Sequence, residues 1–181
     1  MKLHDRKSPR AKWHDYNGAE YFVTICTKNR LHFFGEVVDG AMQLTDVGNH
    51  ASQCIMKISE IHPDVEVPLF VVMPNHIHMV ILLDGGVGLP HCDSPTDGNS
   101  VSAGKDTEMQ RRANRCGRLS HVIGQFKSAV TRFAREKQIP FSWQPRYHDR
   151  IVRNRDEMNE IALYIEQNPM RWEMDRFYGC E

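Results

Sequence analysis

The chain has 181 residues, 40% of them hydrophobic and 25% charged, which predicts one globular domain over 1–181 with a buried core. No apolar run approaches the roughly 20 residues of a membrane span, and five scattered cysteines without a CxxC pair favour a reduced, cytoplasmic protein over a zinc ribbon or a disulfide framework. The 23 basic and 23 acidic residues cancel, which by itself argues weakly against a nucleic-acid partner.

The first half of the chain alternates strand and helix patterns. Residues 1–18 are polar and basic and indicate an arm. Residues 21–27 are rich in β-branched and aromatic side chains and predict a strand, and residues 35–44 predict a hairpin that turns at Asp39-Gly40. Thr45 offers an N-cap for a helix through about residue 61. Two further strands are expected over 65–73 and 76–83, either separate or joined as one long strand kinked at Pro74.

The second half begins with a change of composition. Residues 84–117 are rich in Gly, Asp, Ser and Pro and indicate a flexible loop or insertion. A helix over 119–137, a strand over 147–152 and a helix over 156–168 follow. The order of these elements predicts an α+β fold of the ferredoxin-like or RRM-like split βαβ type, an antiparallel sheet with helices on one face. That fold hosts many functions and indicates none of them.

The most informative motif is His76-Ile77-His78 in the third core strand. Side chains alternate along a strand, so the two histidines share one face while Ile77 points into the core. Roughly 6.5–7 Å separates them along the strand, and two imidazoles at that spacing can converge on one metal ion. A pair of surface histidines explains an isolated H-x-H equally well, so the rest of the chain has to decide.

The last predicted helix carries Tyr164 and Asn168 four residues apart, so a hydroxyl and an amide project from one side of it. A single helical tyrosine is more often a packing residue with a solvated hydroxyl. Taken together, however, these motifs resemble the REP-associated tyrosine transposases, single-tyrosine HUH enzymes related to the small single-strand insertion-sequence transposases. Five blocks in the right order carry the resemblance: residues 18–24, 72–78, 124–128, 143–151 and 164–169.

The resemblance implies a role for each motif residue. His76 and His78 correspond to the metal ligands, Asn168 to the polar residue that completes the metal site, and Tyr164 to the nucleophile. Two imidazoles and an amide oxygen, without a thiolate, suit Mg²⁺ or Mn²⁺ better than a structural zinc ion. Two residues are candidates for a supporting role: Asp149, which either orients a ligand histidine or caps a turn, and Gln167, which points about 100° away from Asn168.

The predicted reaction is attack by Tyr164 on a phosphodiester of single-stranded DNA, which gives a 5′-phosphotyrosyl enzyme and a free 3′-hydroxyl. The resemblance implies hairpin DNA with a single-stranded flank as the substrate. Basic residues outnumber acids by nine to three over 105–137, which suits a phosphate backbone, although a charge run is usually a solvated face. The candidates for DNA contacts are Arg6, Lys7, Arg10, Arg111, Arg112, Arg115, Lys127 and Arg132.

Two alternatives from other classes remain. A non-catalytic protein that binds hairpin or single-stranded DNA on the same fold has no need for two histidines, a tyrosine and an asparagine together. An RNA-binding module would favour exposed aromatic residues on the central strands, where this chain has histidines and aliphatic residues. The sequence leaves open whether the protein is a monomer or a homodimer, and whether Tyr164 acts in its own chain or in a partner.

Overall fold

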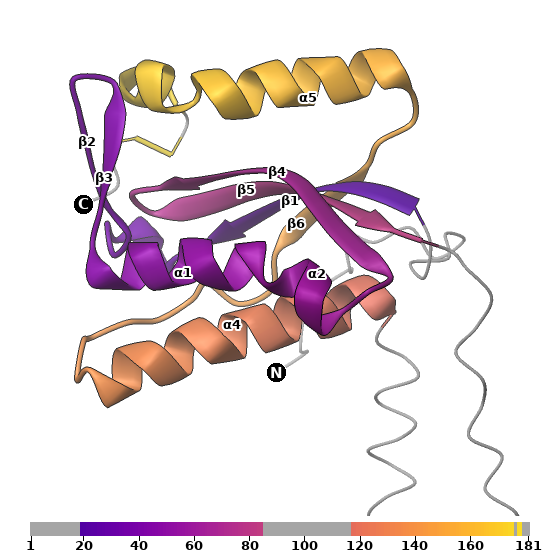
Figure 1. Ribbon diagram of the computed structural model, residues 1–181. Coiled ribbons are helices and arrows are strands. Elements are labelled where there is room, and N and C mark those ends of the chain that lie inside the picture. The colour runs from indigo at the N-terminus through magenta and orange to yellow at the C-terminus, as the bar shows by residue number, and fades with distance from the viewer. Residues whose placement is uncertain (1–18, 85–116, 176, 179–181) are drawn as a thin grey trace, which may run out of the picture.

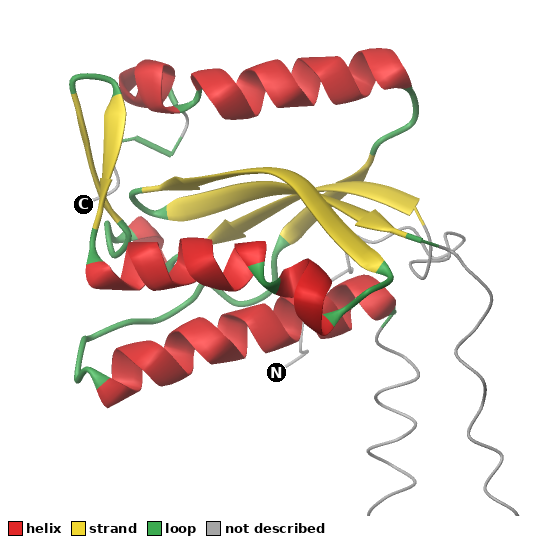
Figure 2. Ribbon diagram, in the orientation of Figure 1, coloured by secondary structure: helices red, strands yellow, loops and turns green. Residues whose placement is uncertain are grey.

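The computed structural model describes residues 19–84, 117–175 and 177–178. The expected arm over 1–18 and almost all of the expected loop over 84–117 therefore lie outside the described residues. The described elements form three layers, with a sheet between two layers of helices (Figures 1 and 2). Among the described helices, none combines the length and the apolar character that crossing a bilayer requires.

The sheet has the split βαβ arrangement, and the predicted α+β fold class is confirmed. Its four strands run antiparallel in the order β4-β5-β1-β6. Strands β4 and β5 form a hairpin in which Met73 pairs with His76 across the turn, so the alternative of one long kinked strand is wrong. The strands are β1 (Ala19–Cys26), β4 (Val65–Met73), β5 (His76–Leu83) and β6 (His148–Ile151).

Three helices cover one face of this sheet (Figure 1). They are α1 (Asp46–Met56), α2 (Ile58–Ile61) and α4 (Arg118–Glu136). Thr45 caps α1 as expected, because its Oγ1 accepts a hydrogen bond from the Gly48 amide at 3.2 Å. The single helix predicted through residue 61 is broken at Lys57, which ends α1 and precedes α2. Buried side chains of α1 and α4 join Ile77 and Met79 of β5 in the main core.

The opposite face of the sheet is covered by α5 (Arg155–Gln167), which corrects the expectation that all helices lie on one face (Figure 1). The physical reason is that β5 is buried on both sides, so both sides need a covering layer. Ile161 and Ile165 of α5 pack there against Val80 in a second core cluster. The short helix η2 (Pro169–Met174) then turns the chain back toward the sheet.

The start of α5 is fixed by a reciprocal cap. The Asn154 Oδ1 accepts from the Glu157 amide at 2.8 Å, and Glu157 Oε2 accepts from the Arg153 amide at 2.8 Å. Glu157 also forms an ion pair with Arg150 of β6. Beside η2 lies the predicted hairpin of β2 (Gly35–Val38) and β3 (Ala41–Leu44), and the remaining short helix is η1 (Lys28–Arg30) (Figure 1).

Candidate active site

Two buried histidines lie on the α5 face of β5, as the alternation of the strand predicts. His76 and His78 are at most 1% exposed, and their ring centroids are 4.5 Å apart. Ile77 between them is fully buried in the main core on the other face. One strand therefore supplies a core residue and two imidazoles within three positions.

Each imidazole is held by a hydrogen bond at its Nδ1 atom. His78 Nδ1 lies 2.8 Å from Oγ1 of Thr24, the residue paired with it across the sheet on β1. His76 Nδ1 lies 2.9 Å from Oδ1 of Asn75, whose Nδ2 donates to the Phe177 carbonyl at 3.0 Å. In the tautomer with hydrogen on Nδ1, both rings present an Nε2 lone pair, the form in which imidazole binds a metal.

The last long helix brings two more predicted residues to these histidines. The Tyr164 hydroxyl lies 3.2 Å from His78 Nε2, and Tyr164 is 40% exposed, so solvent reaches it. Asn168 lies one turn further along and is 2% exposed. Its side-chain oxygen is buried and, among the described residues, accepts no hydrogen bond. Because a buried polar atom is usually satisfied, this oxygen suits a ligand role.

Asp175 completes the group and was missed from the sequence. Its Oδ2 accepts from the Tyr164 hydroxyl and from Asn168 Nδ2, each at 3.2 Å. His76, His78 and Asp175 each offer one ligand atom, and these three atoms lie within 4.8 Å of one another, so the group could hold a metal ion. No spacing rule predicts that Asp175 lies near the histidines, because this residue follows the irregular helix η2.

A cavity of about 530 Å³ opens beside Tyr164, between α5 and the sheet edge. It is lined from the sheet by Phe22, Thr24 and His148 and from α5 by Glu160. His148 pairs with Thr24, so it shares the face that carries His78. Asp149, the candidate for a supporting role, also lines this cavity. Its partner across the sheet is Val23 of the main core, and the residue hydrogen-bonded to His78 Nδ1 is Thr24. Gln167 lies on α5, half-buried.

Two of the candidates for DNA contacts are described, and they differ in setting. Lys127 Nζ donates to the Gln144 carbonyl at 2.9 Å and to the Arg146 carbonyl at 3.0 Å, and burial lowers the pKa of its ammonium. This side chain ties α4 to the connector before β6. Arg132 is exposed on α4. The other candidates lie outside the described residues: Arg6, Lys7, Arg10, Arg111, Arg112 and Arg115.

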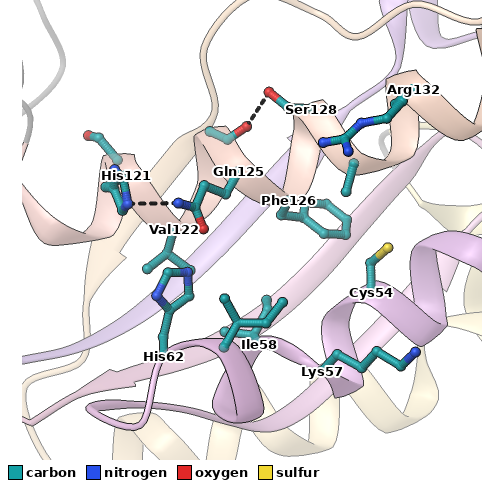
Figure 3. A pocket seen from close by; sticks show the side chains of 14 residues that line it. Cys54, Lys57, Ile58, His62, His121, Val122, Gln125, Phe126, Ser128 and Arg132 are labelled. Carbon is teal, nitrogen blue, oxygen red and sulfur yellow. Dashed lines mark hydrogen bonds between the residues drawn. The ribbon is translucent and has the colours of Figure 1, made fainter.

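Arg132 belongs to a second cavity, of about 770 Å³, between α2 and α4 (Figure 3). Ile58 and Phe126 supply apolar walls, and His62 and His121 lie at one end (Figure 3). Burial is the main cause that lowers the pKa of His62, and the nearby Arg118 lowers it further. The residues that line this cavity come mainly from α1, α2 and α4, which lie across the sheet from α5 (Figure 1).

The fold defined by this sheet and its helices also occurs in a solved transposase structure. A solved structure of a REP-associated tyrosine transposase bound to a REP hairpin aligns with 93% of this chain and 77% of its own, with a TM-score of 0.56 and 16% sequence identity. The chain therefore has the REP-associated tyrosine transposase fold.

A closer relative in sequence comes from Haemophilus influenzae. This uncharacterized protein is 33% identical over 179 residues, which are 97% of the present chain and 94% of the relative. The chain belongs to the same family as that protein. No family model matches the chain.

Proposed function

We propose that the protein is a metal-dependent single-stranded DNA endonuclease and strand transferase whose nucleophile is Tyr164. The observation that carries the proposal is the approach of the Tyr164 hydroxyl to within 3.2 Å of His78, beside three potential ligand atoms clustered within 4.8 Å. The transposase fold adds support, and by likeness to the hairpin-bound neighbour we propose hairpin DNA with a single-stranded flank as the substrate.

The residues present fit a hard divalent cation, Mg²⁺ or Mn²⁺. His76 and His78 would supply two nitrogens, and the third position has two candidates, the buried amide oxygen of Asn168 and the carboxylate of Asp175. Imidazole, amide and carboxylate ligands without a thiolate suit such ions. When bound, the cation would neutralise charge on the scissile phosphate and polarise its phosphorus.

The chain's own groups account for the bond changes. Tyrosine has an ordinary pKa near 10, so its hydroxyl must lose a proton to attack. Here that hydroxyl is oriented by donating to Asp175 Oδ2. A bond forms between the Tyr164 oxygen and phosphorus while the bond from phosphorus to the 3′ oxygen breaks. The phenolic proton leaves to solvent and the departing oxygen takes one up, which gives a 5′-phosphotyrosyl enzyme and a 3′-hydroxyl. Attack by another 3′-hydroxyl reverses the step and joins strands without ATP.

The test is a denaturant-resistant adduct between the full chain and hairpin DNA in Mn²⁺. Probes labelled on either side of the cleavage site report polarity, and we expect the adduct to carry the downstream label. Tyr164→Phe and chelation should each abolish it, whereas the matched control Tyr178→Phe, at an exposed tyrosine, should retain it. A hairpin that binds with Mn²⁺ present and yields no adduct would instead support the non-catalytic DNA-binding protein.

A further inference from the structure

The cavity beside Tyr164 has the shape and position to receive part of the substrate. Its volume of about 530 Å³ lies in the range of small-ligand sites. Tyr164 forms part of its wall, so whatever enters it lies next to the reacting phosphate. A strand of DNA offers two kinds of group at that point, a charged phosphate and a nucleobase, and the lining decides between them.

The floor of the cavity is aromatic. The Phe22 ring stacks on the His78 ring, with centroids 5.2 Å apart and planes 23° apart, and it meets the Tyr164 ring edge-on at 6.1 Å. Phe22 is thus held on two sides while it lines the cavity. An aromatic ring fixed in this way suits stacking by an unpaired base, the usual mode by which proteins hold single strands.

The wall on α5 is acidic and disfavours a phosphate. Glu160 lines the cavity one turn before Tyr164 and is exposed. Glu157, one turn earlier still, has its charge compensated by the ion pair with Arg150 and its Oε2 engaged by the Arg153 amide. Asp149 of β6 also lines the cavity, and Glu160 is the exposed carboxylate that α5 contributes next to Tyr164. A carboxylate accepts hydrogen bonds and repels a phosphate.

We propose that this cavity is a nucleobase subsite for a residue flanking the scissile phosphate, with Phe22 as the stacking platform and Glu160 as the acceptor for an exocyclic amino group. The proposal rests on the proposed function, because it requires a DNA strand at Tyr164. His148, exposed on the opposite wall, can donate to or accept from a second atom of the base.

The chemistry of Glu160 ranks the four bases. Guanine offers two adjacent N–H donors to a carboxylate, and cytosine and adenine each offer an amino group. Thymine has no amino group, and its single ring N–H lies between two carbonyl oxygens that a carboxylate repels. The subsite therefore favours guanine, cytosine and adenine and rejects thymine.

The experiment measures binding without chemistry. Fluorescence anisotropy in EDTA would measure the affinity of the full chain for a set of labelled hairpins. In the reference hairpin the single-stranded flank is all thymine, and in the others one guanine, adenine or cytosine replaces thymine at successive positions. At one position we expect about tenfold tighter binding than for thymine. Glu160→Gln should remove most of that preference, and Glu166→Gln, at another exposed glutamate of α5 outside the cavity lining, should keep it.

The outcomes separate this inference from the proposed function. Base-independent binding by the wild-type chain, or a preference that Glu160→Gln leaves intact, overturns the subsite. Adduct formation on the same hairpins in Mn²⁺ measures the transferase activity separately. If an adduct forms but binding shows no base preference, the subsite is contradicted and the proposed function stands. Failure to bind any of the hairpins contradicts both.

Discussion

The two faces of the sheet differ in the kinds of side chain that they carry. The face under α1 and α4 is a continuous apolar core, whereas the face under α5 carries His76, His78 and Thr24 among its apolar residues. Both faces are buried, so burial alone does not distinguish a core position from a site position. The difference teaches that on this strand structural and chemical roles alternate residue by residue, with the period of the strand itself.

Removing an imidazole from the α5 face should have the greatest consequence. In His78→Ala we expect adduct formation to fall by at least about 1,000-fold, because the charge stabilisation supplied by a bound metal amounts to several kcal/mol. Single-turnover adduct yield in Mn²⁺ measures this. The matched variant His121→Ala, at an exposed histidine on α4, should react at the wild-type rate. A fully active His78→Ala would contradict the proposed role of His78 as a metal ligand.

The neighbouring position should show the opposite phenotype. Ile77→Ala deletes a fully buried side chain from the main core, so the free energy of unfolding should fall by about 2–5 kcal/mol. Urea denaturation measures this, and the fraction that remains folded should still form adduct. Leu163→Ala, at a side chain that is 53% exposed on α5, should change stability by about 0.5 kcal/mol or less. A comparable loss in both variants would contradict the division between faces.

A third variant changes a residue that supports a proposed ligand and leaves the ligand itself in place. Asn75→Ala removes the oxygen 2.9 Å from His76 Nδ1, and loss of such a supporting hydrogen bond should weaken Mn²⁺ binding by about 10–100-fold. Isothermal titration with Mn²⁺ measures the affinity. Asn159→Ala, at an exposed asparagine of α5, is the control. Equal affinity in Asn75→Ala and wild type would limit Asn75 to a structural role.

The smallest effect is expected on the side of the sheet covered by α1, α2 and α4, at the start of α4. Arg118 Nε donates to Asp64 Oδ2 at 2.7 Å, and this bond holds the pKa of the Asp64 carboxyl below its usual range. A lowered folded-state pKa means that the stabilisation is present above the unfolded value of about 3.9. It is lost as pH falls through the folded value.

Because the Asp64 side chain is 41% exposed, the pair should contribute about 1 kcal/mol or less at pH 7. Urea unfolding of wild type and Asp64→Asn should show that difference at pH 7 and a smaller one near pH 3. A difference that grows on acidification would contradict the sign. Adduct formation at pH 7 should be unchanged in Asp64→Asn, because the Asp64–Arg118 pair lies on the side of α1, α2 and α4, away from the face that carries His76 and His78.

Local rules were enough to predict much of this molecule. The alternation of β5 places two histidines together, and the helical period places Tyr164 above Asn168. The Asp39-Gly40 turn is also confirmed, since both residues have positive φ values of 51° and 72°. These features depend on residues at most four apart, a range within which backbone geometry alone fixes the relation between side chains.

Features that depend on how distant segments meet could not be predicted. Thr24 reaches His78 only through the antiparallel register of β1 with β5. Asp175 reaches Tyr164 only because η2 redirects the chain after Pro169, which in the sequence indicated no more than the end of a helix. The position of α5 likewise depends on the apolar side chains of the second sheet face that it covers, not on its own pattern.

The contact between Tyr164 and His78 is made within one chain, and this bears on the molecularity of the proposed reaction. A nucleophile and an imidazole cluster supplied by the same polypeptide make strand cleavage first order in protein. The yield of adduct per chain should therefore not change on dilution while the DNA remains saturating. Mixing His78→Ala chains with Tyr164→Phe chains should restore nothing, since neither can complete the other's site.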